Sequence, residues 1–111
     1  MGLLSFNAAQ TAMLTQQANN LQMSINQKED ARAGILQEST NLGNLKANYT
    51  TDLNDTSTYI EQIDQRLATL NALDSQLEAQ INNERMKLQI VEQRKQTYQS
   101  KLDESISNTF R

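Results

Sequence analysis

The amino-acid sequence predicts an all-α protein, a long antiparallel helical hairpin of the coiled-coil type that associates with further copies. Three observations predict this fold. The 111 residues include no Pro and only three Gly, which removes the usual signals of β-hairpins and tight loops. Apolar residues recur at steps of three and four, as they do along one face of a helix. A single cluster of helix-breaking residues lies near the midpoint, so the two arms have nearly equal length.

The first helix is expected over residues 1–50. Its stripe begins with Leu14, Ala18, Leu21 and Ile25 and resumes at Ile35, Leu42, Leu45 and Tyr49. Between these stretches, Lys28 and Arg32 occupy stripe positions, and Gly34 costs a helix about 1 kcal/mol relative to Ala. Residues 28–34 are therefore predicted to form either a hinge or a solvated patch.

The first 27 residues contain no charged side chain, although they include Leu3, Leu4, Phe6 and Met13. Two interpretations of this segment stay open. It can be the ordinary start of an amphipathic helix. It can also be a surface buried between subunits, where charge would be costly to desolvate.

Residues 51–57 are predicted to form the turn, because Thr, Ser, Asn and Asp side chains compete locally with helical hydrogen bonds. Thr58 and Glu61 match a capping box that would open the second helix, and Asp55 or Ser57 could cap it instead. If the cluster does not break the chain, the alternative is one continuous helix. The similar length of the two arms favours the hairpin.

The second helix is expected over residues 58–110, with one apolar stripe. A helix of about 50 residues would be roughly 75 Å long, so its stripe has to be covered by another long helix, from this chain or a neighbour. The series Leu70, Leu73, Leu77, Ile81 and the series Tyr98, Leu102, Ile106 depart from a strict heptad, which predicts straightened helices. The residues expected to pack, within the hairpin or between copies, are Leu3, Leu4, Phe6, Leu14, Leu21, Ile25, Ile60, Ile63, Leu67, Leu70, Leu77, Ile81, Leu88, Val91, Tyr98, Leu102, Ile106 and Phe110.

The composition argues against enzymatic chemistry. The chain has no His and no Cys, so the usual general base, the thiol nucleophile and the nitrogen and sulfur metal ligands are missing. No catalytic residue, cofactor or metal site is therefore predicted. The net charge of −3 argues against nucleic acid as a partner. No stretch is apolar enough for a transmembrane helix or for a Sec-type signal.

The polar residues are mostly uncharged. There are 14 Gln, 12 Asn, 10 Thr and 8 Ser, compared with 23 charged residues. Faces of this kind can pack on copies of themselves without burying charge. The same bias also occurs as a simple compositional feature of coiled-coil proteins.

Two pieces near the end of the chain, Tyr98-Gln99-Ser100-Lys101-Leu102 and Ile106-Ser107-Asn108-Thr109-Phe110-Arg111, resemble parts of bacterial type III secretion needle subunits. The uncharged start is similar to the uncleaved export signals of secreted axial proteins, including flagellar ones. This resemblance implies a secreted subunit that self-assembles into a helical tube, with the stripe and both termini buried between copies. Phe110 would then be an anchor; otherwise it frays at the end of a coiled coil.

Two functions remain open on the sequence. The first is a non-enzymatic structural subunit of a secreted or virion-type helical filament. The alternative is a cytoplasmic coiled-coil adaptor or export chaperone that holds a partner helix in a groove.

Overall fold

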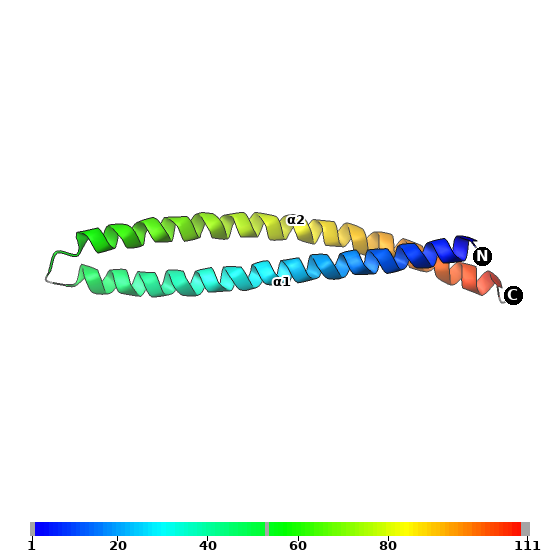
Figure 1. Ribbon diagram of the computed structural model, residues 1–111, viewed down its shortest axis with the longest axis horizontal. Coiled ribbons are helices and arrows are strands. Elements are labelled where there is room, and N and C mark those ends of the chain that lie inside the picture. The colour runs from blue at the N-terminus through cyan, green and yellow to red at the C-terminus, as the bar shows by residue number, and fades with distance from the viewer. Residues whose placement is uncertain (1, 53, 110–111) are drawn as a thin grey trace. The chain divides into compact units, whose positions relative to one another are not determined.

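The computed structural model describes residues 2–52 and 54–109, and these residues form two α-helices (Figure 1). Helix α1 spans Gly2–Thr50 and helix α2 spans Ser57–Thr109. The chain divides into two compact units. Unit 1 comprises Met1–Asn26 and Asn82–Arg111, and unit 2 comprises Gln27–Ile81. Each unit pairs a segment of α1 with a segment of α2, so the prediction of an all-α hairpin is confirmed and the single continuous helix is wrong.

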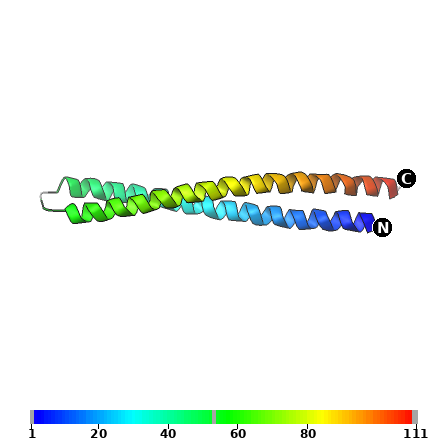
Figure 2. The same ribbon diagram turned by 90° about the horizontal axis from the view of Figure 1, so that it is seen from above.

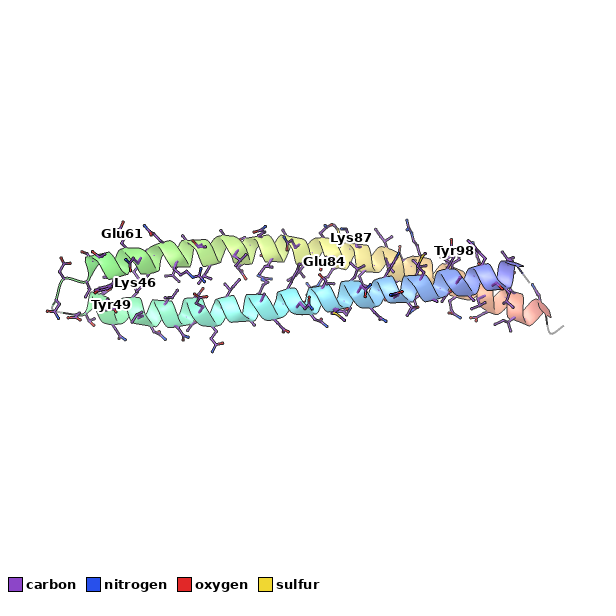
Figure 3. All side chains as sticks on the ribbon, viewed as in Figure 1. Lys46, Tyr49, Glu61, Glu84, Lys87 and Tyr98 are labelled. Atoms are coloured by element: carbon purple, nitrogen blue, oxygen red, sulfur yellow. The ribbon has the colours of Figure 1, made fainter. Side chains whose placement is uncertain are left out.

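Unit 2 contains the turn of the hairpin and the two helix segments next to it. Four apolar side chains are buried between these segments: Ile35 of α1 and Ile63, Leu70 and Ile81 of α2. Fully burying an aliphatic side chain of this size contributes about 1.5–3 kcal/mol. The stacked rings of Tyr49 and Tyr59, with centroids 5.3 Å apart, cover the end of the unit next to the turn. Figure 3 labels Tyr49 and Lys46 between the two helices at this end.

The turn is closed by two side chains that bond the helix ends. The Thr56 hydroxyl donates to the Tyr49 carbonyl at 2.7 Å, so it satisfies one of the last carbonyls of α1, which have no helical partner. The Thr56 carbonyl accepts the first helical bond of α2, from the Ile60 amide. One Asp55 carboxylate oxygen accepts from both the amide and the hydroxyl of Ser57. The capping box predicted at Thr58 is therefore wrong, because the helix starts earlier, at Ser57. Asp55, one of the predicted alternatives, bonds this first helical residue from the turn.

Unit 1 joins the first half of α1 to the second half of α2. Leu14, Ala18 and Ile25 are its buried apolar residues. Helix α1 begins and helix α2 ends at the same end of this unit, as both Figure 1 and Figure 2 show. The two segments are therefore antiparallel here too.

The inner face of each helix follows a strict heptad, which corrects the departures predicted for residues 70–81 and 98–106. We call the positions on this face the seam. In α1 the seam is Leu4, Asn7, Thr11, Leu14, Ala18, Leu21, Ile25, Lys28, Arg32, Ile35, Ser39, Leu42, Lys46 and Tyr49. In α2 it is Ile60, Ile63, Leu67, Leu70, Asp74, Leu77, Ile81, Glu84, Leu88, Val91, Lys95, Tyr98, Leu102 and Ser105.

Polar side chains explain why the apolar residues alone suggested another spacing. Asp74, rather than Leu73, faces the opposite helix, and Leu73 is 43% exposed. In the same way Ser105 takes the seam position and Ile106 is exposed. Steps of three and four therefore continue through both places, as in a coiled coil.

Helix α1 runs without a break through residues 28–34. Lys28 and Arg32 lie half-buried on the seam, where Arg32 has an acidic partner on α2, described below. Gly34 is exposed, and a methyl group added there would contact nothing. The hinge at 28–34 stays a prediction.

Candidate interaction surface

The predicted packing residues divide into three groups. Most lie on the seam, buried or half-buried within the chain. Three are exposed, namely Leu3, Phe6 and Ile106. Phe110 lies outside the described residues. The three exposed residues are therefore the predicted packing residues that are accessible to another molecule.

One side of unit 1 carries an exposed apolar strip that contains two of these residues. Leu3, Phe6 and Met13 come from α1, and Ile90 comes from α2. Phe6 leans on Tyr98 of α2 in an edge-to-face contact with ring centroids 6.0 Å apart. About half of the Phe6 side chain still faces solvent. Several exposed large apolar side chains along one flank mark a candidate interaction site.

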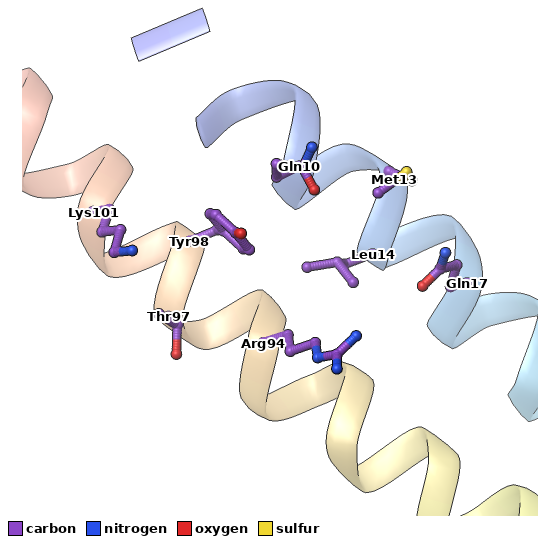
Figure 4. Close-up of a pocket in the computed structure, with 8 residues that line it drawn as sticks. All are labelled: Gln10, Met13, Leu14, Gln17, Arg94, Thr97, Tyr98 and Lys101. Atoms are coloured by element: carbon purple, nitrogen blue, oxygen red, sulfur yellow. The ribbon is translucent and has the colours of Figure 1, made fainter. Parts of the chain in front are cut away.

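Two hollows lie along the same strip between α1 and α2. Figure 4 shows one of them, in which Leu14 and Tyr98 point toward each other. It is lined by Gln10, Met13, Leu14, Gln17, Arg94, Thr97, Tyr98 and Lys101. The second is lined by Gln17, Asn20, Leu21, Lys87, Ile90, Val91 and Arg94. Because Gln17 and Arg94 belong to both, the hollows form one groove, which we call the unit 1 groove.

The two walls of the unit 1 groove differ in charge. The α1 wall has only amide and apolar side chains, since residues 1–27 carry no charge. The α2 wall carries Lys87, Arg94 and Lys101, each one residue before a seam position and therefore on the same flank of the helix. The Lys101 ammonium lies 5.3 Å from the centre of the Tyr98 ring. The groove thus has an apolar floor, one neutral wall and one cationic wall.

In unit 2, three cations pair with carboxylates across the two helices. Arg32 donates to both carboxylate oxygens of Asp74, at 2.9 and 3.1 Å. Its guanidinium also lies 3.6 Å from Glu78. The hydrogen bond from Arg32 lowers the pKa of Asp74, and the hydrogen bond to Asp74 raises the pKa of Arg32.

Two further ion pairs lie nearer the turn. Arg66 donates to both oxygens of Glu38, and this hydrogen bond raises the pKa of Arg66. Lys46 lies 2.7 Å from Asp64. Exposed pairs stabilise a fold only slightly, so their main effect is on the alignment of the two helices.

Sequence reasoning missed one buried polar group on the seam. Asn7 is 1% exposed, and its side-chain nitrogen has no hydrogen-bond partner within the described residues. Its backbone carbonyl accepts from the Thr11 hydroxyl at 2.8 Å. Counting heptad steps back from Leu14 would have found it, because Asn7 lies seven residues earlier. A buried Asn weakens a coiled coil but restricts its register and oligomeric state.

The described residues offer no metal site, since no three Asp or Glu side chains among them are grouped closely enough to hold an ion. Within the same residues, neither helix is long and apolar enough to cross a membrane.

The fold defines a class of protein, an antiparallel helical hairpin, and unit 1 carries a groove between its two helix segments. No known protein family matches the chain, and no curated protein or solved structure is significantly similar to it. The resemblance to secretion needle subunits therefore stays an expectation from the sequence.

Proposed function

We propose that this chain is a non-enzymatic structural subunit that self-assembles through unit 1 into a helical filament or needle. The observation that carries the proposal is the absence of charged side chains from residues 1–27, which bear exposed Leu3, Phe6 and Met13. Apolar and amide groups can be buried against another subunit without desolvating a charge. Contact with further copies would remove this exposed apolar surface from water.

The test is whether the purified protein assembles, and whether assembly depends on this strip. We expect filaments in negative-stain electron microscopy and a fast-sedimenting species whose amount rises steeply with concentration. The variant Met13→Gln with Ile90→Gln removes apolar surface from the groove and should suppress both signals. Both side chains are about half exposed, so circular dichroism should show unchanged helix content.

Met23→Gln with Met86→Gln is the matched control. It also replaces two exposed apolar residues of unit 1, but neither lines the groove. The control should assemble like the wild type. A wild-type protein that stays monomeric or dimeric at high concentration would overturn the proposal.

Export without a cleaved Sec signal is part of this proposal. Its support is the similarity of the uncharged start to uncleaved export signals. Mass spectrometry of protein recovered outside the producing cell should find residues 1–27 intact. Protein confined to the cytoplasm would contradict secretion.

A second function is favoured by the shape of the unit 1 groove. Leu21, Ile90 and Val91 line one part of it, and an apolar groove of this kind can accept the apolar face of a partner helix. The chain would then be a cytoplasmic adaptor or export chaperone. This function predicts one small oligomer at every concentration, whereas a filament subunit shows a threshold above which assemblies form.

A further inference from the structure

The charges of the two units are opposite in sign. Residues 27–81 contain four Lys or Arg and nine Asp or Glu, a net charge of −5. Residues 1–26 and 82–111 contain six Lys or Arg and four Asp or Glu, a net charge of +2. The positively charged unit 1 of one copy therefore attracts the negatively charged unit 2 of another copy.

Among the described residues, the α1 wall of the unit 1 groove places no carboxylate opposite the cations of α2. Within the described residues neither Lys87 nor Arg94 forms an ion pair, because the α1 segment beside them has no charge at all. In unit 2, by contrast, Arg32, Lys46 and Arg66 each have an acidic partner. The cationic wall is thus available to a carboxylate-bearing molecule.

The groove specifies the shape of that molecule as well as its charge. Lys87, Arg94 and Lys101 follow one another at intervals of seven residues, about 10.5 Å apart along the helix axis. Beside them lie exposed Met13 and Ile90. The complementary surface therefore carries an apolar projection and carboxylates about 10–20 Å apart.

Unit 2 has such a surface. Asp64, Asn71 and Glu78 follow seam residues directly, so they lie on one flank of α2 at the same seven-residue interval. On α1, Leu36 is 69% exposed, and it shares a hollow with Glu29 and Asn71. The Glu78 side chain is 58% exposed despite its contact with Arg32. Asp64 also pairs with Lys46 of its own chain, at 2.7 Å. We call this surface, with Glu29, Leu36, Asp64 and Glu78, the acidic face.

We propose that the unit 1 groove of one copy docks on the acidic face of unit 2 in a second copy. The inference rests on the proposed self-assembly and names the two surfaces that meet. Because the surfaces are different, the contact is heterologous, and each added copy leaves one free groove and one free acidic face. Such a contact propagates, as a filament requires.

Charge neutralisation tests the groove. The variant Lys87→Gln, Arg94→Gln, Lys101→Gln should raise the critical concentration for assembly at least about tenfold. The matched control Gln89→Glu, Gln93→Glu, Gln96→Glu changes the net charge of the same helix equally, at exposed positions that do not line the groove. It should leave the critical concentration within about twofold of the wild type. Assembly of the wild type should also weaken as salt is added.

Charge reversal identifies the occupant. Lys87→Glu, Arg94→Glu, Lys101→Glu should block assembly, and so should Glu29→Lys, Glu78→Lys, because each variant then meets itself with like charges. An equimolar mixture should assemble again, since the reversed groove of one variant attracts the reversed acidic face of the other. Circular dichroism of each variant alone checks that it remains helical.

The outcomes separate the two proposals. A wild-type protein that never assembles overturns the proposed function. A wild type that assembles while the neutralised variant assembles equally well overturns only the docking of the groove on the acidic face. Loss of assembly without rescue in the mixture also overturns it, and assigns the cationic wall to another partner.

Discussion

Arg32 of α1 and Asp74 of α2 form a two-point ion pair on the seam of unit 2, with nitrogen–oxygen distances of 2.9 and 3.1 Å. Both residues occupy positions that an apolar side chain would normally take in a coiled coil. A planar guanidinium donates two parallel bonds to a carboxylate only in one alignment. The pair therefore specifies the register of the two helices around it.

Acidification should destabilise the fold through this pair. The hydrogen bond from Arg32 lowers the pKa of Asp74, so its stabilisation is complete above the ordinary pKa of about 3.9 and is lost as the pH falls through the lower, folded value. Asp55, whose pKa is lowered by the Ser57 hydroxyl, acts in the same direction. We expect the thermal midpoint, measured by circular dichroism, to fall below about pH 4.

Asp74→Asn isolates the contribution of the pair to that pH dependence. We expect the thermal midpoint of the variant at neutral pH to lie roughly a few degrees below that of the wild type. On acidification, the midpoint of the variant should fall by less than the midpoint of the wild type. Asp30→Asn, at an exposed position, is the control and should behave like the wild type. If acidification lowers the thermal midpoint of Asp74→Asn as much as that of the wild type, the role of the pair is contradicted.

Leu70 and Leu73 provide a direct test of the heptad seam. Leu70 is 1% exposed, whereas Leu73 is 43% exposed although it is only three residues away. Leu70→Ala should lower the free energy of unfolding by about 2–5 kcal/mol. Leu73→Ala should lower it by about 0.5 kcal/mol or less. Urea unfolding followed by circular dichroism measures both, and equal losses would place Leu73 on the seam after all.

The turn should depend on Thr56 rather than Thr58. The Thr56 hydroxyl is the donor to the Tyr49 carbonyl, and Thr56→Val keeps the shape of the side chain but removes that donor. We expect a loss of about 0.5–2 kcal/mol in unfolding free energy. Thr58→Val, at an exposed position, should change it by less than about 0.5 kcal/mol. A larger effect at Thr58 would restore the capping box predicted there.

Replacing Asn7 should stabilise unit 1. Within the part of the chain that the structure describes, its side-chain nitrogen is buried without a hydrogen-bond partner, a situation that costs about 1–3 kcal/mol. Asn7→Leu removes this cost and leaves the bond from Thr11 intact, because that bond is to the backbone carbonyl. Asn19→Leu, at an exposed position, is the control for the change in helix propensity. A lower thermal midpoint in Asn7→Leu than in the control would show that Asn7 is satisfied in solution.

Much of the fold could be predicted from residue types alone. The absence of Pro, the steps of three and four, and the Thr, Ser, Asn and Asp cluster at 50–58 predicted two helices and the turn between them. These signals are local, because a helix and its ends depend on residues within about four positions. The predicted bounds of 1–50 and 58–110 lie close to the observed Gly2–Thr50 and Ser57–Thr109.

The inward-facing position of Asp74 could not be predicted in the same way. An apolar residue identifies the inner face by itself, but Asp74 can face inward only because Arg32 lies opposite it on the other helix. That partner is 42 residues away in the sequence, so no local pattern contains it. The prediction that Leu73 lies on the inner face is wrong for this reason. Leu73 is apolar, but the residue that faces the opposite helix is Asp74, which is paired with Arg32.

The sequence by itself determined that the chain is helical, where it turns, and that its first 27 residues carry no charge. Those properties depend on local backbone preferences and on composition. Only the tertiary structure decided which residues of each helix face each other and which cations are paired. It also brought Met13 and Ile90 together with Lys87, Arg94 and Lys101 in one groove. Side chains far apart in the sequence meet only when two helices align, and the ion pairs and buried residues that select the alignment belong to both.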